Sequence, residues 1–187
     1  MLKNLMVAAV AAMTLTVGAQ ADLFTSKETT VQLGYNKLSI ETGANQTIDA
    51  NGVAMHINTK RQLMDSKWSI LMPMNMGYSS TTDMNGYTGT TTNTGSTALL
   101  DIGIGLGVGY EPLKDLTISA LVNGTMIAEG DFYWWGAEGG ADVTYEFAKY
   151  WVINAQYLVG SMKLQASTSA TDTVSTSRAY LGIGYRF

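Results

Sequence analysis

Apolar residues alternate with small or polar residues in eight segments of the chain. In the last segment, residues 179–187, every odd position is apolar and every even position except Tyr180 is glycine or arginine. The other segments are residues 31–35, 53–57, 68–78, 100–110, 116–126, 137–147 and 151–159. Successive side chains of a β-strand point to opposite faces, so this pattern predicts eight strands, each with one apolar face.

The connections between these segments alternate in length. Those after the second, fourth and sixth segments are short, around residues 65–66, 111–115 and 148–149. The others are mostly longer and polar, above all residues 79–97 and 163–177, which are rich in serine and threonine. Six of the rows span nine to eleven residues, which suits tilted strands that cross a bilayer, with short turns on one side and long loops on the other. We therefore predict an all-β, eight-stranded, antiparallel up-and-down transmembrane barrel.

The amino-terminal segment has a different character. Lys3 precedes an apolar stretch at residues 5–17, and Ala19-Gln20-Ala21 matches a signal-peptidase site. This pattern predicts a secretory signal peptide at residues 1–21 and a barrel domain at residues 22–187, rather than the alternative of an amphipathic amino-terminal helix, because the stretch has no polar face. The chain is 46% hydrophobic and 14% charged, yet no later apolar run is long enough for a spanning helix.

Aromatic residues gather near the ends of the predicted strands. With both termini on the periplasmic side, one set falls at each membrane interface, where amphipathic rings are favoured. The predicted girdles comprise Trp68, Tyr110, Phe147 and Trp151 on the periplasmic side and Tyr35, Tyr78, Trp134 and Trp135 on the outer side.

The whole pattern resembles the small OmpA/OmpX-type outer-membrane barrels of Gram-negative bacteria. The resemblance rests on the signal peptide, the eight alternating rows and the terminal residues Leu181, Ile183, Tyr185 and Phe187. It implies location in the bacterial outer membrane, contact with lipid and lipopolysaccharide, and recognition of the last strand by the barrel assembly machinery. Pro73 departs from a regular strand because it lacks an N–H group, so we expect a bulge or irregularity there.

Charged residues at inward positions predict a polar network in the lumen. Its members are His56, Lys60, Asp101, Glu111, Glu138, Asp142, Glu146, Arg178 and Arg186. An eight-stranded barrel is just wide enough for side chains to fill it, so we expect a closed, side-chain-filled lumen. The alternative is a narrow porin-like channel for ions or small solutes, since many inward positions are glycines. The same glycines also permit the tight curvature of a small barrel.

Evidence for catalysis is weak. The one histidine, His56, faces the predicted lumen without a nearby His-x-Ser motif, so a lipid-modifying enzyme is the least favoured hypothesis. The glycines at 103, 105, 107 and 109 do not fit a nucleotide-binding loop, since Val108 replaces the third required glycine. We therefore predict a non-enzymatic protein without cofactor or metal.

The expected role is structural or surface-interacting. A net charge of −4 does not favour nucleic acid as a partner. A surface ligand at the polar loops 79–97 and 163–177 is the remaining partner hypothesis.

Overall fold

The structure is a computed structural model that describes residues 24–42, 46–64, 66–85, 98–129, 132–165 and 173–187. The predicted signal peptide lies outside these residues. Among the described residues, no helix is long and apolar enough to cross a membrane.

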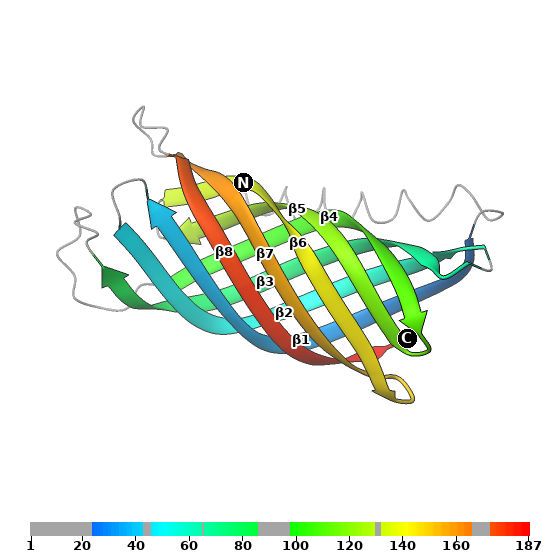
Figure 1. Ribbon diagram of the computed structural model, residues 1–187. Helices are drawn as coiled ribbons and strands as arrows, with labels where there is room; N and C mark the ends of the chain where they lie inside the picture. Colours follow the sequence, from blue (N-terminus) through cyan, green and yellow to red (C-terminus); the bar gives the residue numbers. More distant parts are fainter. Residues whose placement is uncertain (1–23, 43–45, 65, 86–97, 130–131, 166–172) are drawn as a thin grey trace.

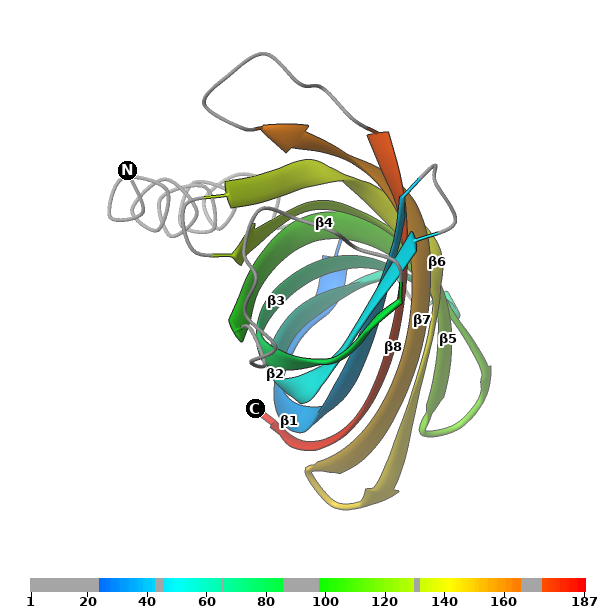
Figure 2. The ribbon, with the colours of Figure 1, turned by 90° about the vertical axis from the view of Figure 1, so that its left-hand side faces the viewer.

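Eight antiparallel strands form one closed barrel in sequence order, as Figures 1 and 2 show. The strands are β1 Phe24–Thr42, β2 Gln46–Leu63, β3 Trp68–Asn85, β4 Ala98–Leu113, β5 Leu116–Glu129, β6 Phe132–Ala148, β7 Trp151–Gln165 and β8 Thr173–Arg186. The last strand pairs with the first, and Phe187 exchanges backbone hydrogen bonds with Thr29. The predicted up-and-down eight-stranded barrel is confirmed.

The strands are strongly tilted, as the register around the barrel shows. A path across paired residues leaves β3 at Ser69 and returns to β3 at Ser79, ten residues further along. The intervening partners are Gly109, Ser119, Asp142, Gln156, Tyr180, Asn36 and Gly52. Such a stagger across eight strands corresponds to a tilt of about 40°. Inward residues from distant parts of the sequence therefore share one level of the lumen.

A belt of outward apolar side chains surrounds the barrel. On β3 it runs from Trp68 to Tyr78, both more than half exposed, and the inward residues between them are buried. Ten residues on a tilted strand rise about 25 Å along the barrel axis, which matches the apolar band of outer-membrane barrels. Leu33, Leu106 and Leu181 continue the belt on other strands.

Beyond the belt, the inward and outward faces exchange their polarity. On β1, the outward residues change from Leu33 and Tyr35 to Lys37, while the inward Leu38 and Ile40 are fully buried. Because the strands continue past this change of polarity, they are longer than predicted, at 14 to 19 residues. A strand with a polar outer face and an apolar inner face is suited to water rather than lipid.

This extension corrects the predicted loops 79–97 and 163–177. Strand β3 continues to Asn85, β7 continues to Gln165, and β8 begins at Thr173. Serine and threonine there occupy strand positions beyond the apolar belt, so their polarity does not mark a loop. Residues 86–97 and 166–172 lie outside the described part of the chain.

One further prediction is wrong, and another is confirmed in one of its two alternatives. Trp134, predicted for the outer girdle, points into the barrel and is 3% exposed, whereas its neighbour Trp135 is 53% exposed. Adjacent strand residues face opposite sides, so both could not join one girdle. At Pro73 the predicted irregularity is present, although no bulge forms. Pairing with β4 is interrupted between Leu71 and Met74 and resumes in the same register, because proline lacks the N–H group.

Candidate functional site in the barrel interior

An apolar cluster fills the lumen at the end where the strands extend beyond the belt. Its buried members are Leu38, Ile40, Ile48, Ala50, Leu99, Ile127, Trp134, Met162 and Val174. Seven strands contribute to it, and its larger side chains have almost no exposed surface. The cluster acts as a plug at this mouth, and we call it the apolar plug.

Next to the apolar plug, the lumen contains a buried ion triad. Arg178 on β8 binds Asp101 on β4, and its Nε lies 3.4 Å from a carboxylate oxygen of Glu138 on β6. All three side chains are at most 1% exposed. Glu138 also accepts hydrogen bonds from the hydroxyls of Thr125 at 2.9 Å and Thr176 at 3.2 Å. The triad connects strands on opposite sides of the barrel.

The middle of the lumen is polar and closely packed. The ring of His56 stacks on that of Tyr180, with 3.6 Å between centroids. Asp142 accepts hydrogen bonds from Asn154 and, at 3.2 Å, from the Thr144 hydroxyl. The ring of His56 therefore packs against an aromatic side chain in the interior of the barrel.

Inward glycines allow this packing. A methyl group added at Gly140 would collide with the backbone of β7 at Tyr157 and Leu158, and one at Gly105 would collide with Asn123. These glycines therefore permit close approach of neighbouring groups and do not leave an open conduit. Deeper in the lumen, Leu71, Leu121 and Leu158 form a second buried apolar cluster.

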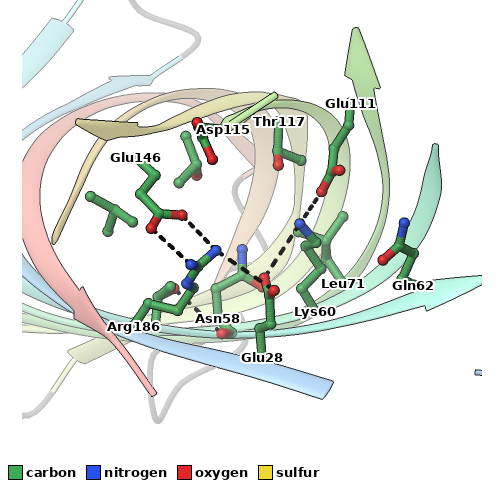
Figure 3. Close-up of a pocket in the computed structure, with 13 residues that line it drawn as sticks. Glu28, Asn58, Lys60, Gln62, Leu71, Glu111, Asp115, Thr117, Glu146 and Arg186 are labelled. Carbon is green, nitrogen blue, oxygen red and sulfur yellow. Dashed lines mark hydrogen bonds and ion pairs between the residues drawn. The ribbon is translucent and has the colours of Figure 1, made fainter. Parts of the chain in front are cut away.

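A chain of ion pairs lines the mouth at the tight-turn end (Figure 3). Lys60 binds Glu111 and lies 3.5 Å from Glu28, while Arg186 lies 3.6 Å from Glu28 and 2.6 Å from Glu146. The order Glu111–Lys60–Glu28–Arg186–Glu146 alternates in sign and connects β4, β2, β1, β8 and β6. These groups border a cavity of about 140 Å³, which we call the vestibule.

The structure places the predicted lumen residues inside the barrel in three groups. Asp101, Glu138 and Arg178 meet in the triad, His56 and Asp142 lie in the middle, and the remaining four border the vestibule: Lys60, Glu111, Glu146 and Arg186. Sequence reasoning missed Glu28 and Tyr180. Glu28 lies before the first alternating segment, but its even number places it on the same inward face as Gln32. Tyr180 also has an even number, like the inward glycines of the last strand, so alternation could have assigned both residues to the lumen.

The predicted girdle and assembly residues other than Trp134 lie on the outside. At the tight-turn end, the ring of Trp68 lies tilted against that of Tyr110, with centroids 4.8 Å apart, and Trp151 contacts Tyr185 edge-on at 5.7 Å. Tyr185 also contacts Phe187, at 5.1 Å. Leu181 and Ile183 are exposed on the same strand. Their roles in membrane anchoring and assembly stay predictions.

The chain is similar to known proteins in its structure but not closely in its sequence. Neither protein-family models nor curated proteins yield a match to the sequence. One similar structure is that of Ail, the attachment invasion locus protein of Yersinia pestis, in complex with the heparin analogue sucrose octasulfate. Its TM-score is 0.59 at 13% sequence identity, and the match covers 87% of this chain and all of Ail. Neisserial surface protein A has a TM-score of 0.54 at 10% identity, with the same coverage of both chains. The chain therefore has the fold of the small eight-stranded outer-membrane β-barrels.

Proposed function

We propose that the protein is an integral outer-membrane barrel with a closed lumen, which acts through its surface and its structure rather than as a pore or an enzyme. The observation that carries the proposal is the sequence of barriers along the lumen. The apolar plug is followed by the buried ion triad, and Leu71, Leu121 and Leu158 lie further in. An ion crossing the barrel would have to displace packed side chains at each level.

The orientation follows from the two ends of the barrel. The end with the plug carries the strand extensions, and the other end carries tight turns together with Phe187. Short turns in outer-membrane barrels lie on the periplasmic side. We infer that both termini are periplasmic and that the strand extensions project from the cell surface. The barrel assembly machinery would then read the last strand, and lipopolysaccharide would surround the outer girdle of Tyr35, Tyr78 and Trp135.

A surface ligand, if bound, would meet the strand extensions and the segments that connect them. Ail is described with a heparin analogue, but the outward residues that the structure describes in these extensions carry both signs of charge. Lys37 and Lys163 are accompanied by Glu41 and Asp49 on the outward face. We therefore favour a ligand that is not strongly anionic. The absence of a nucleophile in contact with His56 among the described residues supports a non-enzymatic role.

Single-channel recording in a planar bilayer tests the closed lumen. Folded protein in the bilayer should leave the current at its baseline, because no continuous water path crosses the apolar plug. A porin added to the same bilayer provides the positive control. Steady ohmic steps from the purified protein would overturn the proposal in favour of a narrow channel.

A further inference from the structure

The alternating chain of ion pairs at the vestibule is incomplete on one side. It runs from Glu111 on β4 through β2, β1 and β8 to Glu146 on β6. Strands β3, β5 and β7 contribute no member; ion pairs span β3 and β7, but among the described residues none spans β5. Both ends of the chain are carboxylates. Glu28 contacts two cationic groups, whereas Glu111 and Glu146 each have one in the described part of the chain.

The gap contains a third carboxylate, on an exposed turn residue, and a hydroxyl that faces the cavity. Asp115, in the turn before β5, and Thr117, on β5, both line the vestibule. Figure 3 shows them between Glu146 and Glu111, across the cavity from Arg186 and Lys60. Within the described residues Asp115 has no ion pair, and Thr117, which is 8% exposed, has no hydrogen-bond partner. This hydroxyl opens into the cavity, where a ligand group or water can serve as its hydrogen-bond partner.

The charge balance of the vestibule favours a cation at this gap. Four carboxylates, Glu28, Glu111, Asp115 and Glu146, face two cationic side chains, Lys60 and Arg186, which leaves a formal charge of −2. The lysines of the neighbouring turns, Lys67, Lys114 and Lys149, do not line the cavity. A positive group placed between Glu111, Asp115 and Glu146 would close the alternation around the whole mouth.

We propose that the vestibule binds a small organic dication, a linear alkyl diamine, with its ammonium groups in the gap at β5. No group of three acidic, histidine or cysteine side chains among the described residues could hold a metal ion. Two ammonium groups on a short chain would share the carboxylates of Glu111, Asp115 and Glu146. Leu71 and Val152 at the inner wall provide apolar contact for the methylene groups. The cavity of about 140 Å³ is much larger than the roughly 10–15 Å³ that a single water requires on the same measure.

Calorimetric titration of the folded protein in detergent micelles with 1,4-diaminobutane tests this assignment. We expect saturable binding of one ligand per chain that weakens with added salt, because exposed charges are screened. The monoamine 1-aminobutane should bind more weakly, and the neutral 1,4-butanediol should not bind. Equal binding of the monoamine, or no saturable binding of the diamine, would overturn the proposal.

Two variants separate a specific site from general attraction to an acidic protein. Asp115→Asn should lower the affinity about tenfold, as expected for the loss of a charge-assisted hydrogen bond. Asp115 has a φ of 67°, a left-handed conformation that asparagine also tolerates, so the turn should persist. Thr117→Val leaves the charge unchanged and should still weaken binding about threefold through the lost hydroxyl.

The matched control is Glu41→Gln, which removes the same charge from an exposed position at the opposite end of the barrel. Its affinity for the diamine should equal that of the unaltered protein. If Glu41→Gln weakened binding as much as Asp115→Asn, or if Thr117→Val had no effect, the vestibule would not be the binding site. These outcomes do not depend on whether the lumen conducts.

Discussion

Arg178 and Arg186 lie on the same face of β8, eight residues apart, and each contacts two carboxylates from other strands. Their surroundings differ greatly. The Arg178 side chain is 1% exposed, beside the apolar plug, whereas the Arg186 side chain is 28% exposed at the vestibule. Contacts between a guanidinium and carboxylates therefore occur once in the buried interior and once at the exposed vestibule.

This difference in burial assigns different roles to the two sites. In the interior, one guanidinium contacts two carboxylates, so removing it leaves both buried without a cationic partner. At the opening, water screens each group, and the pairs contribute little to stability. The buried triad is therefore suited to fixing one arrangement of strands, while the exposed chain keeps carboxylates available to a ligand.

The largest expected effect is at the buried site. Arg178→Met should lower the free energy of unfolding by about 3–5 kcal/mol, because Asp101 and Glu138 would remain buried without a cation. Urea titration of the folded protein in micelles, followed by tryptophan fluorescence, measures the change.

A triple variant sharpens this result. Combining Arg178→Met with Asp101→Asn and Glu138→Gln removes all three charges and should recover more than half of the loss, since no isolated charge remains. A single Arg178→Met variant with unchanged stability would contradict the view that this triad is a dry, mutually dependent unit.

The second effect tests the apolar plug beside the triad. Trp134→Ala should cost about 3 kcal/mol of stability, because it opens a cavity among Leu38, Ile127 and the other plug residues. Trp135→Ala removes the same side chain one residue away, from an exposed position, and should cost less than about 1 kcal/mol. The same unfolding assay compares the two. Equal losses would mean that the plug packs no better than the outer surface.

The sequence was sufficient to predict the number of strands and the facing of most residues. Period-two alternation is a direct result of strand geometry, so inward residues such as His56 and Asp142 could be assigned by parity alone. The strand ends could not be predicted in the same way. At Lys37 and Leu38 the outward residue becomes polar and the inward residue becomes apolar. In the sequence this reversal resembles the end of an alternating segment, although β1 continues to Thr42.

The ion pairs in the lumen depend on the stagger between strands, which cannot be derived from the alternation in the sequence. Arg178 on β8 reaches Asp101 on β4 because of the stagger of ten residues around the barrel, and alternation does not report that stagger. Trp134 was misplaced for a different reason: the preference of aromatic residues for the interface was given more weight than its inward parity. Where the two rules conflict, parity follows from covalent geometry and should decide.

The smallest expected effect is at the exposed site. Arg186→Gln should lower the free energy of unfolding by less than about 1 kcal/mol at low salt, because water already screens its contacts with Glu28 and Glu146. The loss should vanish at about 1 M salt, where the screening length falls to about 3 Å. Arg186→Lys keeps the charge and should behave like the unaltered protein in the same urea titration. A salt-independent loss as large as that of Arg178→Met would show that the vestibule is as dry as the triad, and the proposed contrast between a structural and a ligand-accessible network would fail.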